Sequence, residues 1–241
     1  MNIFSAAFNT ILYQPLFNAL ILLYLYLPGH DFGVAVIILT ILIKLILYPL
    51  GAQAIRSQKA MSSIQPKMKA VQEQYKNDRE KQARAMMDLY KKEKISPFSG
   101  FLPLLIQLPI LFALYRLFWK GFGEEHLGFL YGFVPNPGLI DFTFLGVINL
   151  AAPSVALAIL AGIAQFIQTK MTTPAKAASG KGDMSQMMQK QMLYFLPVFT
   201  VFILWRLPSA VALYWLTTTL FTIVQQYIIL KKHEPAGTSQ N

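Results

Sequence analysis

Long apolar runs recur through this 241-residue chain, and clusters of basic residues separate them. Each run approaches the roughly 20 residues that an α-helix needs to cross the hydrocarbon core of a bilayer. Only 13% of the residues are charged, whereas an ordinary soluble domain has roughly 25%. The pattern therefore predicts an all-α integral membrane protein rather than a soluble domain with a large core.

Five of these runs are predicted spans, with the bounds Val34–Ala52, Phe98–Leu117, Ala152–Thr169, Met192–Trp205 and Ala210–Leu230. Basic clusters follow the first, third and fifth runs. Because Lys and Arg concentrate in loops that stay in the cytoplasm, this spacing predicts an N-terminus outside and a C-terminus inside the cell. The net charge of +10 is then a signal of topology, with weak attraction to anionic lipid, rather than a sign of nucleic-acid binding.

The residue types exclude most enzyme chemistry. The chain has no Cys, and its three His residues lie outside the apolar runs. The sequence contains no pair of carboxylates at catalytic spacing, no Gly-x-Ser-x-Gly motif with a buried His and no Gly-rich phosphate loop. We therefore expect no enzymatic activity, no metal and no cofactor.

The first 30 residues form a separate segment. Residues 3–28 are apolar but divided by Pro15, and no basic region precedes them. We predict that residues 1–30 form an N-terminal helix lying in the outer interface, and a sixth span is the alternative. Residues 31–241 then form the five-span core.

Within this core, residues 54–96 are basic but patterned. Apolar residues recur at spacings of three and four (Met61, Ile64, Met68, Val71, Tyr75), which is typical of one face of a helix. Asn77-Asp78 is a turn signal, and a second helical pattern follows it. Pro66 either weakens the first helix or marks its start. The segment predicts a cytoplasmic antiparallel helical hairpin, either a solvated spacer or a docking arm. By contrast, Ala175–Asp183 is predicted to be a flexible loop.

Lys44 is the ionisable residue deep in a predicted span. It lies ten residues past Val34, which is about 15 Å of helix and close to the middle of the bilayer. A Lys there costs about 2.5–3.5 kcal/mol, and its side chain is too short to reach a headgroup from that depth. We therefore predict a water-filled groove around Lys44. Thr40, Gln107, Gln165 and Thr218 are polar residues of the spans that would line it, although a single Gln can equally be helix–helix glue.

Four stretches of the chain resemble the YidC family of membrane-protein insertases. The most specific is the approach to the second span, Ser96-Pro97-Phe98-Ser99-Gly100-Phe101-Leu102-Pro103, which continues to Gln107-Leu108-Pro109. Three other stretches also match the family: Thr40 to Lys44 with Pro49-Leu50, then Ile64 to Lys76, and finally Leu207-Pro208 to Trp215 with Gln225-Gln226. Lys44 stands where bacterial members usually have Arg, so the charge is kept but the bidentate fork is lost. The resemblance adds Trp215 to the predicted groove and suggests the short form without a large extracytoplasmic domain.

The resemblance implies an insertase of the bacterial plasma membrane. Nascent hydrophobic segments with short polar flanks would enter the groove from the cytoplasm and pass into the lipid bilayer, driven by apolar partition rather than a nucleotide. Ribosomes, the signal recognition machinery and the Sec translocon are expected partners, although the tail His233–Asn241 carries little charge for ribosome binding. Two alternatives remain open: a small-solute transporter or channel in which Lys44 selects anions, and a purely structural assembly factor.

Overall fold

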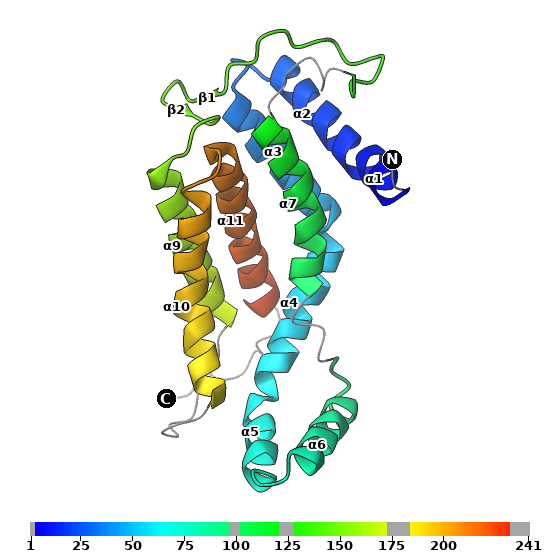
Figure 1. The fold of residues 1–241 in the computed structure, drawn as a ribbon, viewed down its shortest axis with the longest axis vertical. Helices are drawn as coiled ribbons and strands as arrows, with labels where there is room; N and C mark the ends of the chain where they lie inside the picture. The colour runs from blue at the N-terminus through cyan, green and yellow to red at the C-terminus, as the bar shows by residue number, and fades with distance from the viewer. Residues whose placement is uncertain (1–2, 97–101, 121–127, 173–183, 232–241) are drawn as a thin grey trace.

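The computed structural model describes residues 3–96, 102–120, 128–172 and 184–231. The molecule is elongated, with long helices running side by side and a hairpin projecting from one end (Figure 1). The elements in chain order are α1 (Ile3–Phe8), η1 (Asn9–Tyr13), α2 (Gln14–Tyr26), α3 (Phe32–Ile46), α4 (Tyr48–Ser63), α5 (Gln65–Gln74), α6 (Arg79–Lys92), α7 (Leu102–Lys120), β1 (Thr143–Phe144), β2 (Ile148–Asn149), α9 (Val155–Thr172), α10 (Met184–Leu204) and α11 (Ser209–Lys231).

The length and composition of the helices support membrane crossing. Among the described residues, Ser5–Tyr26, Val155–Thr172 and Ser209–Lys231 are each long and apolar enough to span a bilayer, and the pair α3–α4 is a fourth candidate if it counts as one span. The apolar part of α10, Leu193–Leu204, is shorter. The predicted total of five spans therefore stays a prediction, although every predicted span contains a helix.

The first predicted span, Val34–Ala52, was expected to be one helix, but it is two. It breaks at Leu47, where α3 and α4 meet at an angle of 69°. Pro49 lies in the first turn of α4, and a proline there has no N–H to continue the hydrogen bonds of the preceding helix. The polypeptide therefore changes direction one residue past the end of α3.

Helix α11 lies at the centre of the bundle. It packs against α3, α4, α7, α9 and α10, while α9 and α10 pack closely against each other. The α9–α10 contact depends on Gly162, because a Cβ there would lie against the side chain of Val201 and 3.3 Å from the Pro197 carbonyl oxygen. Most of the buried apolar side chains from α2, α3, α7, α9 and α11 belong to one core.

The predicted hairpin contains two short helices, α5 and α6, which lie side by side at one end of the molecule (Figure 1). Pro66 lies in the first turn of α5 and so marks a helix start. The Asp78 carboxylate caps α6 by accepting a hydrogen bond from the Lys81 N–H at 3.0 Å. An ion pair between Lys67 and Glu93, at 2.6 Å, joins the two helices at the end away from the turn.

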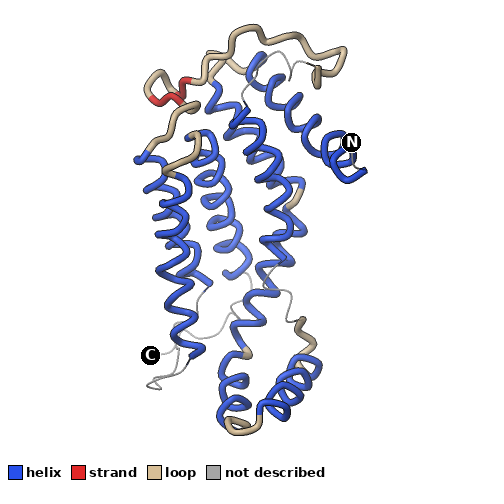
Figure 2. Tube along the Cα trace, viewed as in Figure 1, coloured by secondary structure: helices blue, strands red, loops and turns tan. Residues whose placement is uncertain are grey.

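The opposite end of the bundle is covered by the loop between α7 and α9, described from residue 128 onward (Figure 2). It contains a two-stranded antiparallel ribbon in which Thr143 pairs with Asn149 and Phe144 with Ile148, a small departure from the all-α expectation. Two residues of the turn have positive φ, Leu145 at 51° and Gly146 at 69°, a conformation that glycine adopts without a steric penalty. The Asp31 carboxylate caps α3 and also accepts a hydrogen bond from the Leu145 N–H at 2.6 Å, which fastens the ribbon to the helix.

The N-terminal helix is continuous from α1 through the π-helical turn η1 into α2, and it lies obliquely to the long helices (Figure 1). Asn18, which is 2% exposed, connects it to the α7–α9 loop. Its side-chain amide donates to the Phe129 carbonyl and its oxygen accepts from the Tyr131 N–H, both at 2.8 Å. Whether this helix lies in the interface or crosses the membrane stays a prediction. The predicted flexible loop Ala175–Asp183 lies outside the described residues.

Candidate functional site

Lys44 lies in the last turn of α3, one turn before the break at Leu47, and its side chain is half-buried. Its ammonium donates a hydrogen bond to the Thr222 hydroxyl of α11 at 3.1 Å. Within the described part of the chain, no carboxylate lies within the 4.0 Å of an ion pair with this ammonium. The positive charge is therefore held by a neutral hydroxyl, and two of its three N–H donors have no protein partner among these residues.

Helix α11 also gathers polar side chains from two other helices. The Gln107 amide of α7 donates to the Tyr214 hydroxyl, and the Trp215 indole donates to the Gln165 side-chain oxygen of α9 at 3.2 Å. Below Tyr214, Thr218 and Thr222 follow at intervals of four residues, so all three lie along one face of α11. Lys44 of α3 and Gln107 of α7 thus bond residues of this stripe, whereas Gln165 of α9 bonds Trp215, the residue after Tyr214.

The exposure of α11 changes along this stripe. Residues 209–214 are buried, whereas Trp215, Thr218 and Thr222 are half-buried. The hydroxyl of Thr218 is itself buried and has no hydrogen-bond partner among the described residues. The polar stripe is therefore partly open along its middle turns and closed at the end of the bundle that carries the α7–α9 loop.

The six predicted groove residues are not all brought together. Lys44, Gln107, Gln165, Trp215 and Thr218 are half-buried and lie on or against α11. Thr40 is different, because it is 1% exposed and its hydroxyl donates to the Val36 carbonyl of its own helix at 2.6 Å. Two cavities among the described residues lie elsewhere, one lined by Phe32 and Trp119 near the α7–α9 loop and one on α6. A hydrated groove centred on Lys44 stays a prediction.

Three residues that make polar contacts between helices were not predicted from the sequence. Tyr214 and Thr222 lie four residues before and after Thr218, so the i, i+4 spacing could have found both. The third is Arg116 of α7, whose guanidinium donates to the Asn9 side-chain oxygen at 2.5 Å and lies 4.6 Å from the centre of the Tyr13 ring. Arg116 is a second cation inside a helix of the bundle, and it holds the N-terminal helix rather than the stripe.

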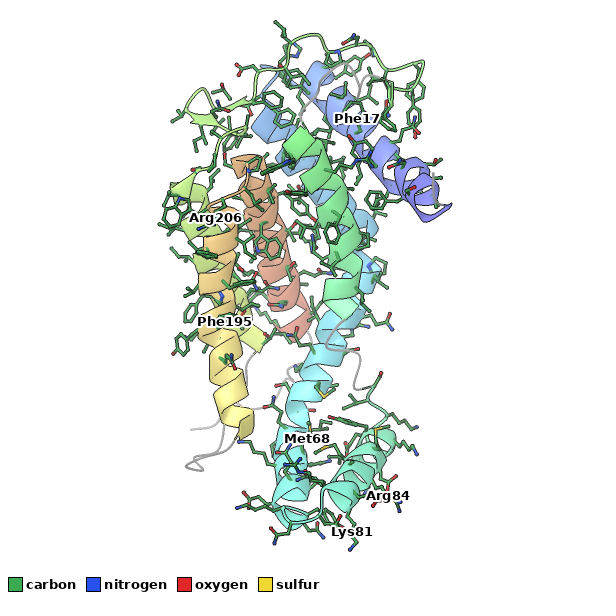
Figure 3. All side chains as sticks on the ribbon, viewed as in Figure 1. Phe17, Met68, Lys81, Arg84, Phe195 and Arg206 are labelled. Atoms are coloured by element: carbon green, nitrogen blue, oxygen red, sulfur yellow. The ribbon has the colours of Figure 1, made fainter. Side chains whose placement is uncertain are left out.

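The surroundings of the site point to a membrane environment. Aromatic and aliphatic side chains of α10 face away from the bundle, such as Phe195, which is 55% exposed and points outward in Figure 3. Arg206, at the end of α10, lies over the ring of Phe202 at 5.0 Å (Figure 3). Among the described residues, no group of three or more His, Asp or Glu side chains could hold a metal ion.

The fold and the site define a class: a helical membrane protein in which polar side chains from several helices surround a half-buried cation. Comparison with known proteins identifies the family. The chain belongs to the family described as 60Kd inner membrane protein, which matches residues 23–236.

Relatives in this family are named as membrane protein insertases. The chain is 37% identical over 222 residues to "Membrane protein insertase YidC" of Geobacter metallireducens, covering 90% of this chain and 36% of the relative. It is 36% identical over 202 residues to the protein of the same name from Fusobacterium nucleatum, covering 84% of this chain and 87% of the relative. The chain thus spans about a third of the Geobacter relative and most of the Fusobacterium one.

A solved structure shares the fold. The crystal structure titled "Active YidC insertase crystal structure with the first transmembrane domain resolved" aligns with a TM-score of 0.59 and 25% sequence identity. The alignment covers 89% of this chain and 46% of that chain. The resemblance predicted from the sequence motifs is confirmed at the level of the family.

Proposed function

We propose that this protein is a membrane-protein insertase that passes hydrophobic segments with short polar flanks from the cytoplasm into the bilayer. The observation that carries the proposal is the state of half-buried Lys44, whose ammonium bonds a neutral threonine and, within the part of the chain that the structure describes, has no carboxylate beside it. The relatives' shared name supports it. The five predicted spans contain polar residues but no Asp or Glu that would titrate or coordinate an ion, which argues against a coupled transporter.

The groove would act by electrostatic attraction. An acidic or polar flank of a client would displace the Thr222 hydroxyl and bind the Lys44 ammonium. Two unit charges 4 Å apart attract by about 4 kcal/mol at an effective dielectric constant of 20, compared with about 1 kcal/mol in water. The buried first turns of α11, residues 209–214, would keep the groove closed to the outside. Partition of the client's apolar segment into lipid then supplies the driving force.

The same proposal includes the orientation and the partners. The α5–α6 hairpin and Lys231 at the end of α11 carry basic residues toward the same end of the molecule (Figure 1), which supports a cytoplasmic location for that end. Residues 31–241 would be the five-span core and residues 1–30 an outer interfacial helix. Nascent membrane proteins and lipid are the proposed partners, with ribosomes, the signal recognition machinery and the Sec translocon as candidates at the hairpin.

A depletion-and-rescue assay tests the role of Lys44. We expect Lys44→Ala to slow insertion of a client with an acidic flank by about 10- to 100-fold, because a hydrogen bond to a charged group contributes about 1.5–3 kcal/mol. Lys44→Glu should be worse and Lys44→Arg tolerated. Lys170→Ala, at an exposed basic residue in the last turn of α9, is the matched control. Insertion at the parental rate by Lys44→Ala would refute the electrostatic role.

Water accessibility tests the groove directly, because the chain has no native cysteine. Thr222→Cys, at the half-buried position beside Lys44, should react with a membrane-impermeant maleimide from the cytoplasmic side, whereas Ala212→Cys, whose position is 0% exposed, should stay protected. Equal protection of both would contradict a hydrated groove. Anion flux into liposomes that depends on Lys44 would favour the channel alternative instead.

A further inference from the structure

The break between α3 and α4 lies between two hydrogen bonds to the same partner helix. Before the break, the Lys44 ammonium donates to the Thr222 hydroxyl at 3.1 Å. After the break, the Gln225 side-chain amide donates to the Tyr48 backbone carbonyl at 3.0 Å. These two contacts are four residues apart on the broken helix and three apart on α11, so α11 bridges Leu47 from both sides.

The second contact has its own packing. Gln225 is 4% exposed, and a larger side chain at Gly51 would press on it. A Cβ on Gly51 would lie 3.0 Å and 3.1 Å from the oxygen and nitrogen of the Gln225 amide. A small apolar cluster surrounds this contact and is separate from the main core; its members are Tyr48, Ala52, Ile55 and Ile229.

Few other contacts fix the direction of α4. Its remaining tertiary contacts among the described elements are with α3, α5, α7 and α9, and each is less extensive than its contact with α11. Beyond residue 55, α4 has no fully buried side chain until Ile64, where α5 begins. The hairpin is therefore an extension of α4 whose angle to the bundle is set near Gly51.

We infer that Gln225 is a positioning residue that fixes the angle of α4, and with it the α5–α6 hairpin, relative to Lys44. This inference deepens the proposed function and rests on it for its meaning in client capture. When a client flank takes the Lys44 ammonium from Thr222, one of the two bridging hydrogen bonds is lost and the bond from Gln225 is the one that remains. Occupancy of the groove and the angle of the hairpin are then coupled, and the coupling acts equally in both directions.

The hairpin angle can be measured without any client. Nitroxide labels at Lys81→Cys on α6 and Lys170→Cys on α9 report it by double electron–electron resonance in the full chain, reconstituted in nanodiscs. Gln225→Met keeps the volume and removes the donor, so we expect a broader distance distribution. An interhelical hydrogen bond in a membrane changes such an equilibrium by about threefold. Gly51→Val should broaden it from the opposite helix, and Gln168→Met on α9 is the matched control.

The outcomes separate this inference from the proposed function. A distribution in Gln225→Met that equals the parental one overturns the inference, whatever the protein's activity. Lys44→Met should broaden the distribution too, and the double variant should show about a ninefold shift if the two contacts act independently. Insertion of an acidic-flank client should fall about threefold in Gln225→Met, which retains Lys44. A loosened hairpin with parental insertion would overturn the coupling, whereas failure of the proposed function appears in the Lys44→Ala assay alone.

Discussion

Asn18 is the main connection between the N-terminal helix and the α7–α9 loop. The free-energy cost of replacing it with leucine can be worked out from its hydrogen bonds. Its side chain makes two hydrogen bonds to the loop, to the Phe129 carbonyl and from the Tyr131 N–H, both at 2.8 Å. In Asn18→Leu the Phe129 carbonyl still accepts from the Gln14 amide at 3.1 Å. The Tyr131 N–H loses the partner that the structure gives it.

Leaving this partly buried donor unsatisfied costs about 1–3 kcal/mol, and the lost bond to Phe129 adds about 1 kcal/mol. We therefore expect Asn18→Leu to weaken the attachment of the loop by about 2–4 kcal/mol. Hydrogen–deuterium exchange of the peptide containing Tyr131 measures this opening, and a 2 kcal/mol change corresponds to about 30-fold faster exchange.

Gln14→Leu is the matched control for Asn18→Leu. It removes one hydrogen bond to Phe129 but leaves the bond from Asn18 in place, so its expected cost is only about 0.5–1.5 kcal/mol. Parental exchange in Asn18→Leu, or equal effects of the two substitutions, would refute the reasoning that the Tyr131 N–H depends on Asn18.

Two further predictions concern the bundle and the hairpin. Gly162→Ala should lower the thermal unfolding temperature in detergent, because its Cβ would press on Val201 and overpacking costs about 1–3 kcal/mol. Adding Val201→Ala to the same chain should restore that temperature. An unchanged unfolding temperature in Gly162→Ala would contradict the close α9–α10 packing. The backbone N–H of Lys81, and then its side chain, hold the pKa of Asp78 below its usual value, so the cap stabilises α6 above about pH 4 and is lost as the pH falls through the lowered pKa. Amide exchange in the first turn of α6 should therefore accelerate only in acid, and Asp78→Asn should abolish that pH dependence.

Much of the fold could be predicted from the sequence because each helix carries its own signal. The predicted last span, Ala210–Leu230, differs from α11 by one residue at each end, since apolar length and flanking lysines define it locally. The break at Leu47 was missed because Pro49 is compatible with a continuous kinked span. The 69° bend depends also on α11, whose Gln225 holds Tyr48 from 177 residues away.

The candidate site was predicted in its residue types but not in its contacts. Lys44 stood out because a charge in an apolar run is costly wherever the helix packs. Its partner could not be chosen from the sequence, since Thr217, Thr218, Thr219 and Thr222 are all close together on α11 and only the rotation of that helix decides which one faces α3. The expectation that Thr40 lines the groove stays a prediction; in the structure its hydroxyl bonds the Val36 carbonyl of its own helix, as a threonine hydroxyl in a helix can.

Neither α5 nor α6 contains a fully buried side chain. Such a pair gains little from removing apolar surface from water, so the free energy that keeps it folded is small beside that of the bundle. It can lose its helical structure locally while the rest of the molecule stays intact. Sequence drift should consequently be tolerated more readily in these two helices than anywhere along α11.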